Sequence, residues 1–129
     1  MWRWYYEKSG KGKAVIVDTW WQTETGGFIG TTLPALQGMK PGSCGPGVLG
    51  IYPVIYDDKG NEVEGGSGRG GNICISNPRP GFMQTIWEDP DRFVDTYFRR
   101  YCKDPDSKDW RDWPYMTGDG AMKSEDGYF

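Results

Sequence analysis

The sequence predicts a mainly β fold of the α+β class, a distorted antiparallel barrel-like subdomain with one or two short helices. Short runs of β-branched and aromatic residues recur between turns, as they do in small barrels and sandwiches. The 20 glycines and 9 prolines among 129 residues interrupt regular structure every few positions. Aromatic residues make up 16% of the chain, which is enough to fill a core between such short strands.

The N-terminal residues predict the end of a helix, then a strand and a polar turn. Residues 1–8 fit the last turns of a helix, and the glycines of residues 9–13 would end it. The apolar run at residues 14–17 predicts a buried strand, because it is short, β-branched and bounded by turn residues. Residues 18–27 form a polar turn that ends in two glycines. We expect this turn at the carboxyl end of the strand, where α/β sheets place their ligands.

Further apolar runs predict the strands of a β-rich part: residues 48–56, 62–64, 72–76 and 115–117. Segments rich in glycine, proline and aspartate separate them as loops or turns: residues 34–47, 57–61, 65–71, 77–81 and 118–120. Residues 65–71 lack the Gly-Lys-Ser/Thr ending of a phosphate-binding loop, so we interpret them as a hairpin connection. Residues 121–129 would begin another hairpin.

One later segment shows a clear helical period. Its apolar side chains follow the spacing i, i+1, i+4 and i+5: Phe93, Val94, Tyr97 and Phe98. Acidic residues and a proline near its start support a helix over residues 89–98. Residues 99–114 are rich in charge and tryptophan, and we expect them to form an exposed loop.

Composition argues against several classes of function. The net charge of −3 provides no basic surface for a phosphate backbone, so no nucleic-acid partner is expected. No apolar stretch resembles a signal peptide or a transmembrane helix, so no membrane partner is expected. The three cysteines match neither a disulfide framework nor a zinc site and predict free thiols in the cytoplasm. Histidine, the commonest metal ligand and general base, is absent.

Two ordered motifs give the sequence a family resemblance. The run Asp18-Thr19-Trp20-Trp21-Gln22-Thr23-Glu24-Thr25-Gly26-Gly27 resembles the adenine-binding motif of the acyl-adenylate-forming enzymes, in the spelling of the acetyl-CoA synthetase branch. Residues 115–121, Tyr-Met-Thr-Gly-Asp-Gly-Ala, resemble the Thr-Gly-Asp motif of the same family. Residues 40–43 and 93–98 also look like the synthetase, so the resemblance runs from about Val17 to the last residue.

The resemblance implies that the chain is a fragment of the large N-terminal domain of a longer enzyme. Residues 1–33 would end the nucleotide-binding subdomain, and residues 34–129 would form the β-rich subdomain. The parent would be an AMP-forming acetate–CoA ligase, which converts acetate and Mg-ATP to acetyl-AMP and then forms acetyl-CoA. The family's phosphate loop and adenylation lysine have no counterpart in this sequence. We therefore expect the chain alone to be inactive, to contain no catalytic residue and to pack against the remainder of its protein.

The resemblance also assigns roles within the two motifs. Nucleotide contacts are expected from seven residues: Asp18, Thr19, Trp20, Trp21, Gln22, Thr23 and Asp119. Trp20 would stack on adenine, and Asp119 would accept hydrogen bonds from the ribose hydroxyls. Trp21 stands where most relatives have glycine, and its indole would fill the acyl pocket and select a small carboxylate. Glu24 would bind the magnesium ion of ATP, because Mg²⁺ takes one or two protein carboxylates besides phosphate oxygens.

Simpler interpretations stay open at this point. Trp20 could be an ordinary core residue, Glu24 a surface acid and Asp119 a turn residue. One methylene changes discrimination by only about 1–3 kcal/mol, so the sequence does not separate acetate from propionate as the substrate. The alternative function is a noncatalytic, tryptophan-rich β-module that binds carbohydrate or peptide, although that function leaves the two ordered motifs unexplained.

Overall fold

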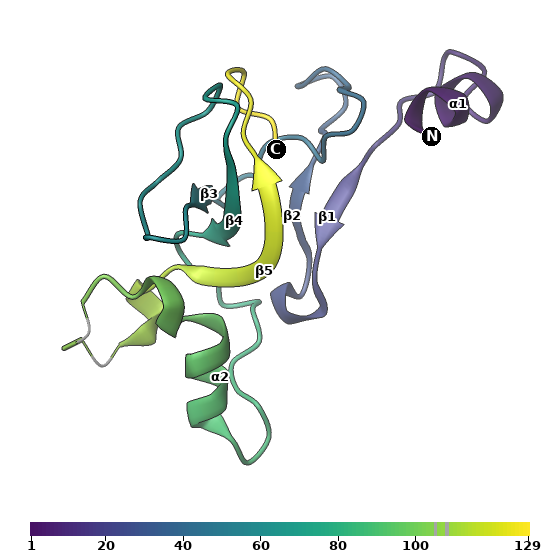
Figure 1. Ribbon diagram of the computed structural model, residues 1–129. Helices are drawn as coiled ribbons and strands as arrows, with labels where there is room; N and C mark the ends of the chain where they lie inside the picture. Colours follow the sequence, from purple (N-terminus) through teal and green to yellow (C-terminus); the bar gives the residue numbers. More distant parts are fainter. Residues whose placement is uncertain (105, 108) are drawn as a thin grey trace.

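The computed structural model of the protein describes residues 1–104, 106–107 and 109–129 (Figure 1). Its elements follow in the order α1 (Trp2–Lys8), β1 (Thr19–Trp21), η1 (Thr23–Thr25), β2 (Phe28–Thr31), β3 (Pro53–Tyr56), β4 (Gly70–Ile75), α2 (Pro90–Tyr97), η2 (Arg99–Tyr101), η3 (Trp110–Asp112) and β5 (Tyr115–Met122). The strands form two antiparallel sheets, β1–β2 and β3–β4–β5. The mixed, antiparallel character is confirmed. The predicted barrel-like closure is wrong for the described residues, because no strand ladder joins the two sheets.

The first sheet is a short ribbon made by the polar segment itself. β1 pairs antiparallel with β2, and Trp20 lies opposite Gly30. The predicted strand at residues 14–17 is wrong: none of the described strands includes them, and Val15 and Val17 are 46% and 43% exposed. A β-branched run is buried only where a partner strand and a packed face receive it. The polar segment therefore forms the strand instead of following one.

The second sheet contains the buried β-branched residues that the sequence predicted. β4 lies between β3 and β5. Ile73, Cys74 and Ile75 on β4 are at most 2% exposed, which confirms the buried strand predicted at residues 72–76. The C-terminal motif, residues 115–121, is part of this sheet, because it lies within β5.

β5 carries an irregularity where the sequence predicted a turn. The predicted turn at residues 118–120 is wrong, because these residues lie inside continuous β5. The register with β4 shifts between Asn72 and Cys74, and Gly118 has a φ of 80°. Glycine adopts this backbone conformation at little cost, so one glycine pattern suits a turn and a β-bulge equally. The strand bends along its length (Figure 1).

The helix predicted over residues 89–98 is confirmed as α2. Asp89 caps its start, accepting a hydrogen bond from the backbone nitrogen of Arg92. The predicted apolar face is buried, since Phe93 and Phe98 are 2% and 1% exposed. Their rings pack together and against Tyr115 of β5, which fixes the helix to the second sheet.

The segment predicted as an exposed loop, residues 99–114, is only partly exposed. Tyr101 and Trp113 are 6% and 4% exposed and belong to the core, so the prediction is wrong at both ends of the segment. The charged residues between them that the structure describes are exposed, whereas Ser107 and Trp110 are half-buried, and positions 105 and 108 lie outside the described residues. The two tryptophans of this segment pack in the core or against it instead, Trp113 fully buried and Trp110 half-buried.

The hairpin predicted over residues 48–64 is shorter than expected. The strand predicted at residues 48–56 begins only with β3, because a turn with Gly50 at φ 82° precedes it. The predicted turn at residues 57–61 is confirmed by the backbone hydrogen bonds across it. The return strand is reduced to one bridge, between Tyr56 and Glu62.

The C-terminal turn is also confirmed, but its second strand is not. The backbone nitrogen of Gly127 donates to the Ser124 carbonyl across the turn. Phe129 pairs instead with the loop after β2: its nitrogen donates to Gly45 at 3.2 Å, and its carbonyl accepts from the nitrogen of Cys44 at 3.1 Å. The loop at residues 34–47 is thereby tied to the end of the chain.

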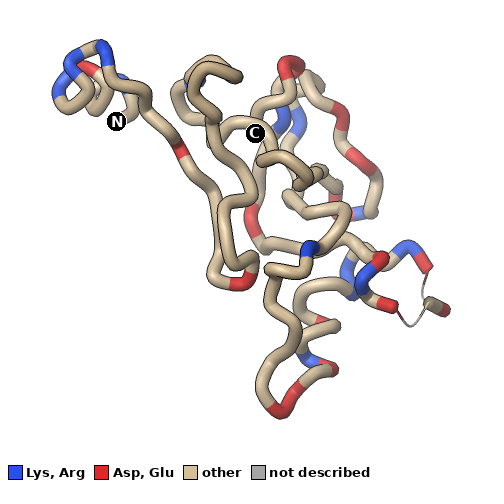
Figure 2. The backbone as a smooth tube through the Cα atoms, turned by 180° about the vertical axis from the view of Figure 1, so that it is seen from behind, with Lys and Arg blue, Asp and Glu red and all other residues tan. Residues whose placement is uncertain are grey.

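Charged residues are distributed unevenly along the backbone. Figure 2 shows lysine and arginine around α1 and its exit, and again among acidic residues in the segments that follow α2. In the part of the chain that the structure describes, no helix has the length and apolarity needed to cross a membrane.

Candidate functional site

The structure brings the two motifs together through Gln22. Its amide nitrogen donates to the carbonyl oxygen of Thr117 at 2.8 Å and to Oδ2 of Asp119 at 3.0 Å. Its amide oxygen accepts from the hydroxyl of Tyr115 at 2.9 Å. Three hydrogen bonds therefore join Gln22, the residue between β1 and η1, to β5, across more than 90 residues of sequence. Gln22 organises the contact between the two motifs.

Asp119 is held by two donors on one oxygen. The indole nitrogen of Trp20 also donates to Oδ2, at 3.1 Å. The β-bulge fixes the backbone: Thr117 Oγ1 donates to the carbonyl of Ile73 at 2.7 Å and accepts from the Asp119 nitrogen at 3.1 Å. Asp119 itself is exposed. Its carboxylate is thus oriented through Oδ2 while the residue still faces solvent.

The local sequence explains the tight turn that places Gln22. The Thr25 side chain closes η1 onto Gln22: its Oγ1 accepts from the Gln22 backbone nitrogen at 3.1 Å and donates to the Gln22 carbonyl oxygen at 2.8 Å. Gly26 ends η1 with a φ of 65°, and a Cβ there would collide with the carbonyl oxygen of Gly81. The Gln-Thr-Glu-Thr-Gly order therefore encodes both ends of this turn.

Glu24 lies on the other side of the turn, against α2. Its Oε1 accepts from the hydroxyl of Tyr97 at 3.1 Å, and its carbonyl accepts from the nitrogen of Met83 at 2.6 Å. The Tyr97 ring stacks on Tyr115 with centroids 5.6 Å apart. Burial, and then Glu24, raise the pKa of Tyr97, so its hydroxyl keeps the proton that it donates. Burial likewise raises the pKa of Tyr115.

The surroundings of Glu24 fit a metal ion that takes one ligand from the protein and most of the others from a bound substrate. No group of three or more Asp, Glu, Cys or His side chains that could bind a metal exists within residues 1–104, 106–107 and 109–129. Glu24 can offer one carboxylate, already oriented by Tyr97. Mg²⁺ accepts that arrangement, because it is often bound by one or two carboxylates together with substrate phosphates.

A hollow of about 870 Å³ borders the two motifs. Its lining includes Asp18, Thr19, Trp20 and Asp119, together with Cys44 and Phe129. This volume lies within the roughly 300–1,000 Å³ of typical small-molecule sites. Four of the seven residues predicted to contact nucleotide therefore share one concave surface.

The other three predicted nucleotide contacts, Trp21, Gln22 and Thr23, are not among the residues that line this hollow in the described structure, and neither is Glu24. Trp21 lies opposite Phe28 across the ribbon, and both side chains are 56% exposed. The register of β1 and β2 shifts between Trp20 and Trp21. Trp20 consequently reaches the hollow while Trp21 lies on an exposed surface with Phe28, and the acyl-pocket role of Trp21 stays a prediction.

Sequence reasoning missed the residues that support the site. Tyr97 and Tyr115 position Glu24 and Gln22, and Cys44 lines the hollow. Tyr115 stands two residues before the Thr-Gly-Asp sequence, which was a usable signal. In the sequence, Tyr97 stands out only as one residue of an apolar helix face. No motif near Cys44 indicates that it lines a site.

Comparison with known proteins places these observations in a family. The profile of the AMP-binding enzyme family matches residues 1–87. Over 128 residues, 99% of this chain, the sequence is 44% identical to the acetyl-coenzyme A synthetase of Rubrobacter xylanophilus and 45% identical to that of Stutzerimonas stutzeri. Acetyl-coenzyme A synthetase 1 of Pseudomonas aeruginosa is 44% identical over the same length. The chain spans 18% of the length of each of these relatives. The chain belongs to the AMP-binding enzyme family.

Proposed function

We propose that the chain forms part of an AMP-forming acetyl-CoA synthetase. In the reaction, a carboxylate oxygen of acetate attacks the α-phosphorus of ATP, and pyrophosphate leaves with the cleaved bond's electrons. The thiol of CoA then takes the acetyl group, and AMP leaves. The observation that carries the proposal is the Gln22 network, because it joins the two family motifs around one carboxylate at the edge of the hollow.

The proposed nucleotide site uses Asp119 and Trp20 in complementary roles. Oδ2 of Asp119 is occupied by Trp20 and Gln22, so Oδ1 is the oxygen that would accept the ribose hydroxyls. Hydrogen bonds to a carboxylate are among the stronger ones in proteins. Trp20 lines the hollow, and its indole would offer an apolar surface for adenine. Asp18 and Thr19 would complete the contacts.

Two further roles rest on the motif resemblance. Trp21 would close the acyl pocket and favour acetate over longer carboxylates. Glu24 would hold Mg²⁺, which neutralises phosphate charge when it is bound with ATP. Tyr97 supports that role by fixing one oxygen of Glu24 at 3.1 Å. Acetate rather than propionate is proposed because the relatives are named acetyl-coenzyme A synthetases.

The remaining expectations belong to the same proposal. The exposed aromatic residues of α1, Trp4 and Tyr5, would pack on further parts of the protein. The three thiols are free, which supports a cytoplasmic location. A carbohydrate- or peptide-binding module is not favoured, because the similarity to synthetases covers nearly the whole chain and includes both motifs.

The test is the substitution Asp119→Ala in the full-length protein. Loss of the charge-assisted bonds is expected to raise the KM for ATP roughly ten- to a hundredfold, at about 1.4 kcal/mol per decade, with a smaller effect on the KM for acetate. Asp106→Ala, in an exposed segment, is the matched control. If Asp119→Ala keeps the wild-type melting temperature and the wild-type KM for ATP, the ribose role is wrong.

A further inference from the structure

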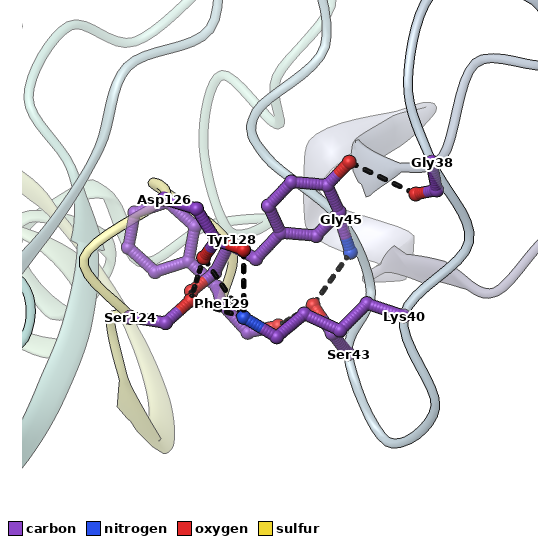
Figure 3. Close-up of polar contacts among 8 residues, drawn as sticks. All are labelled: Gly38, Lys40, Ser43, Gly45, Ser124, Asp126, Tyr128 and Phe129. Atoms are coloured by element: carbon purple, nitrogen blue, oxygen red, sulfur yellow. Dashed lines mark hydrogen bonds and ion pairs between the residues drawn. The ribbon is translucent and has the colours of Figure 1, made fainter.

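A cluster of polar contacts clamps the loop after β2 to the C-terminal turn (Figure 3). Lys40 Nζ lies 2.8 and 2.9 Å from the two carboxylate oxygens of Asp126, and it donates to Ser124 Oγ at 2.9 Å. The three contacts match the three protons of the ammonium group. We call Lys40, Ser124, Asp126 and Tyr128 the latch.

Tyr128 adds two contacts to the latch. Its hydroxyl donates to the carbonyl of Gly38 at 2.9 Å, and its ring lies 5.3 Å from the ammonium group of Lys40. Figure 3 shows these side chains facing the loop from the turn. The hydrogen bond from Lys40 lowers the pKa of Asp126, and Ser124 adds to this effect, so the carboxylate stays charged at neutral pH.

The latch lies next to one wall of the hollow. Ser43 Oγ donates to the carbonyl of Phe129, which also accepts from the backbone nitrogen of Cys44. Ser43, Cys44 and Phe129 all line the hollow, and they lie within four residues of a latch residue. The wall is therefore built from two segments more than 80 residues apart, and the latch holds those segments together.

An ion pair this exposed contributes little by itself. The Lys40 and Asp126 side chains are 40% and 57% exposed, a range in which isolated pairs add little stability. The other ion pairs within the described residues are Arg99–Asp95, Arg100–Asp58 and Arg111–Asp109, and their residues do not line the hollow. What distinguishes the latch is its position and the number of contacts that share Lys40.

We propose that Lys40 is a positioning residue, which fixes the wall formed by Ser43, Cys44 and Phe129 and thereby shapes the ligand site in the hollow. Lys40 touches no proposed reacting atom. The identity of the ligand as ATP rests on the proposed function, whereas the effect of Lys40 on the wall does not.

The test compares charge variants of Lys40 in the full-length protein. Lys40→Glu places a second carboxylate beside Asp126 and should open the wall, and Lys40→Met removes the charge without repulsion. Lys40→Arg keeps a cation that can bond the carboxylate. The swap Lys40→Glu with Asp126→Lys restores opposite charges. Arg100→Glu is the matched control, because Arg100 also combines an ion pair with an aromatic ring.

Alkylation of Cys44 by iodoacetamide, followed on its peptide by mass spectrometry, reports on the wall directly. Burial raises the pKa of the Cys44 thiol, and opening the wall would lower this pKa and expose the sulfur. We expect alkylation of Cys44 to be roughly three- to tenfold faster than in the wild type in Lys40→Glu. The increase in Lys40→Met should be smaller. Lys40→Arg, the swap and Arg100→Glu should stay near the wild-type rate.

The same variants are assayed for ATP dependence. Lys40→Glu should raise the KM for ATP by about the same factor while kcat stays within roughly twofold, and the swap should restore the KM. Unchanged alkylation in both Lys40→Glu and Lys40→Met overturns the proposal. Faster alkylation with an unchanged KM in an active enzyme overturns it equally. If the wild type itself uses no ATP, the proposed function fails, and alkylation still decides the role of Lys40.

Discussion

The substitution Gln22→Glu would turn the attractive contact between the two motifs into a repulsive one without changing the size of the side chain. The amide nitrogen that donates to Thr117 and Asp119 becomes an oxygen, so two hydrogen bonds become repulsive contacts. The oxygen that accepts from Tyr115 is retained. Any loss of local stability then reports on the two donated bonds, not on a cavity.

The expected magnitude follows from the distances. Two lost hydrogen bonds, one of them to a carboxylate, cost about 1–3 kcal/mol together. Two carboxylates at the 3.0 Å separation seen between Gln22 and Asp119 repel by about 1.4 kcal/mol in water and by about 5.5 kcal/mol at an effective dielectric constant of about 20. Asp119 is exposed, so the lower repulsion applies. The local opening free energy of β5 should fall by about 2–4 kcal/mol.

Hydrogen exchange of the peptide that covers β5 measures this local opening in the full-length protein. At about 1.4 kcal/mol per decade, its protected amides should exchange roughly thirty- to seven-hundredfold faster in Gln22→Glu. Gln37→Glu is the matched control, because Gln37 uses its amide oxygen to accept from Leu33 and Glu preserves that bond. Exchange that is equally slow in Gln22→Glu and the wild type would refute the reasoning.

Three further predictions concern the pocket, the metal and the core. Trp21→Gly should raise the ratio of kcat/KM for a medium-chain acid to that for acetate by about tenfold or more, and an unchanged ratio would remove Trp21 from the acyl pocket. Glu24→Gln should raise the Mg²⁺ concentration that gives half-maximal activity, and an identical Mg²⁺ titration would exclude the assigned role. Burial raises the pKa of Cys74 from 9.0 to about 12, so the unfolded thiol ionises first and stability falls as pH rises above 9. The free energy of unfolding measured by denaturation should therefore fall less steeply with pH in Cys74→Ala, by up to about 1.4 kcal/mol per pH unit, and parallel curves would contradict this.

The elements with local signals could be predicted from the sequence. The apolar spacing from Phe93 to Phe98 and the acidic start defined α2, because a helix face and its cap lie within a few residues of each other. The apolar run at residues 14–17 led to a wrong strand prediction, because burial of a strand depends on a partner strand that the run does not specify. The turn predicted at Gly118 was wrong for another reason, since glycine with a positive φ occurs in turns and in β-bulges alike.

The candidate site could be predicted only at the level of its two motifs. Family resemblance picked out Gln22 and Asp119, but the bond between their side chains spans 97 positions and depends on the register of β5. The sequence does not indicate that Lys40 and Asp126 form an ion pair, because the pair exists only where the loop and the C-terminal turn meet in the fold. Long-range contacts of this kind follow from the whole fold.

Acetate-dependent exchange of labelled pyrophosphate into ATP, catalysed by the full-length protein without CoA, tests the proposed function most directly. The first half-reaction is reversible and needs only the nucleotide, the carboxylate and Mg²⁺, so exchange isolates adenylation from thioester formation. The proposal predicts exchange that requires acetate and is strongly reduced in Asp119→Ala at low ATP concentration. Absence of exchange, or exchange that is indifferent to acetate, would contradict it.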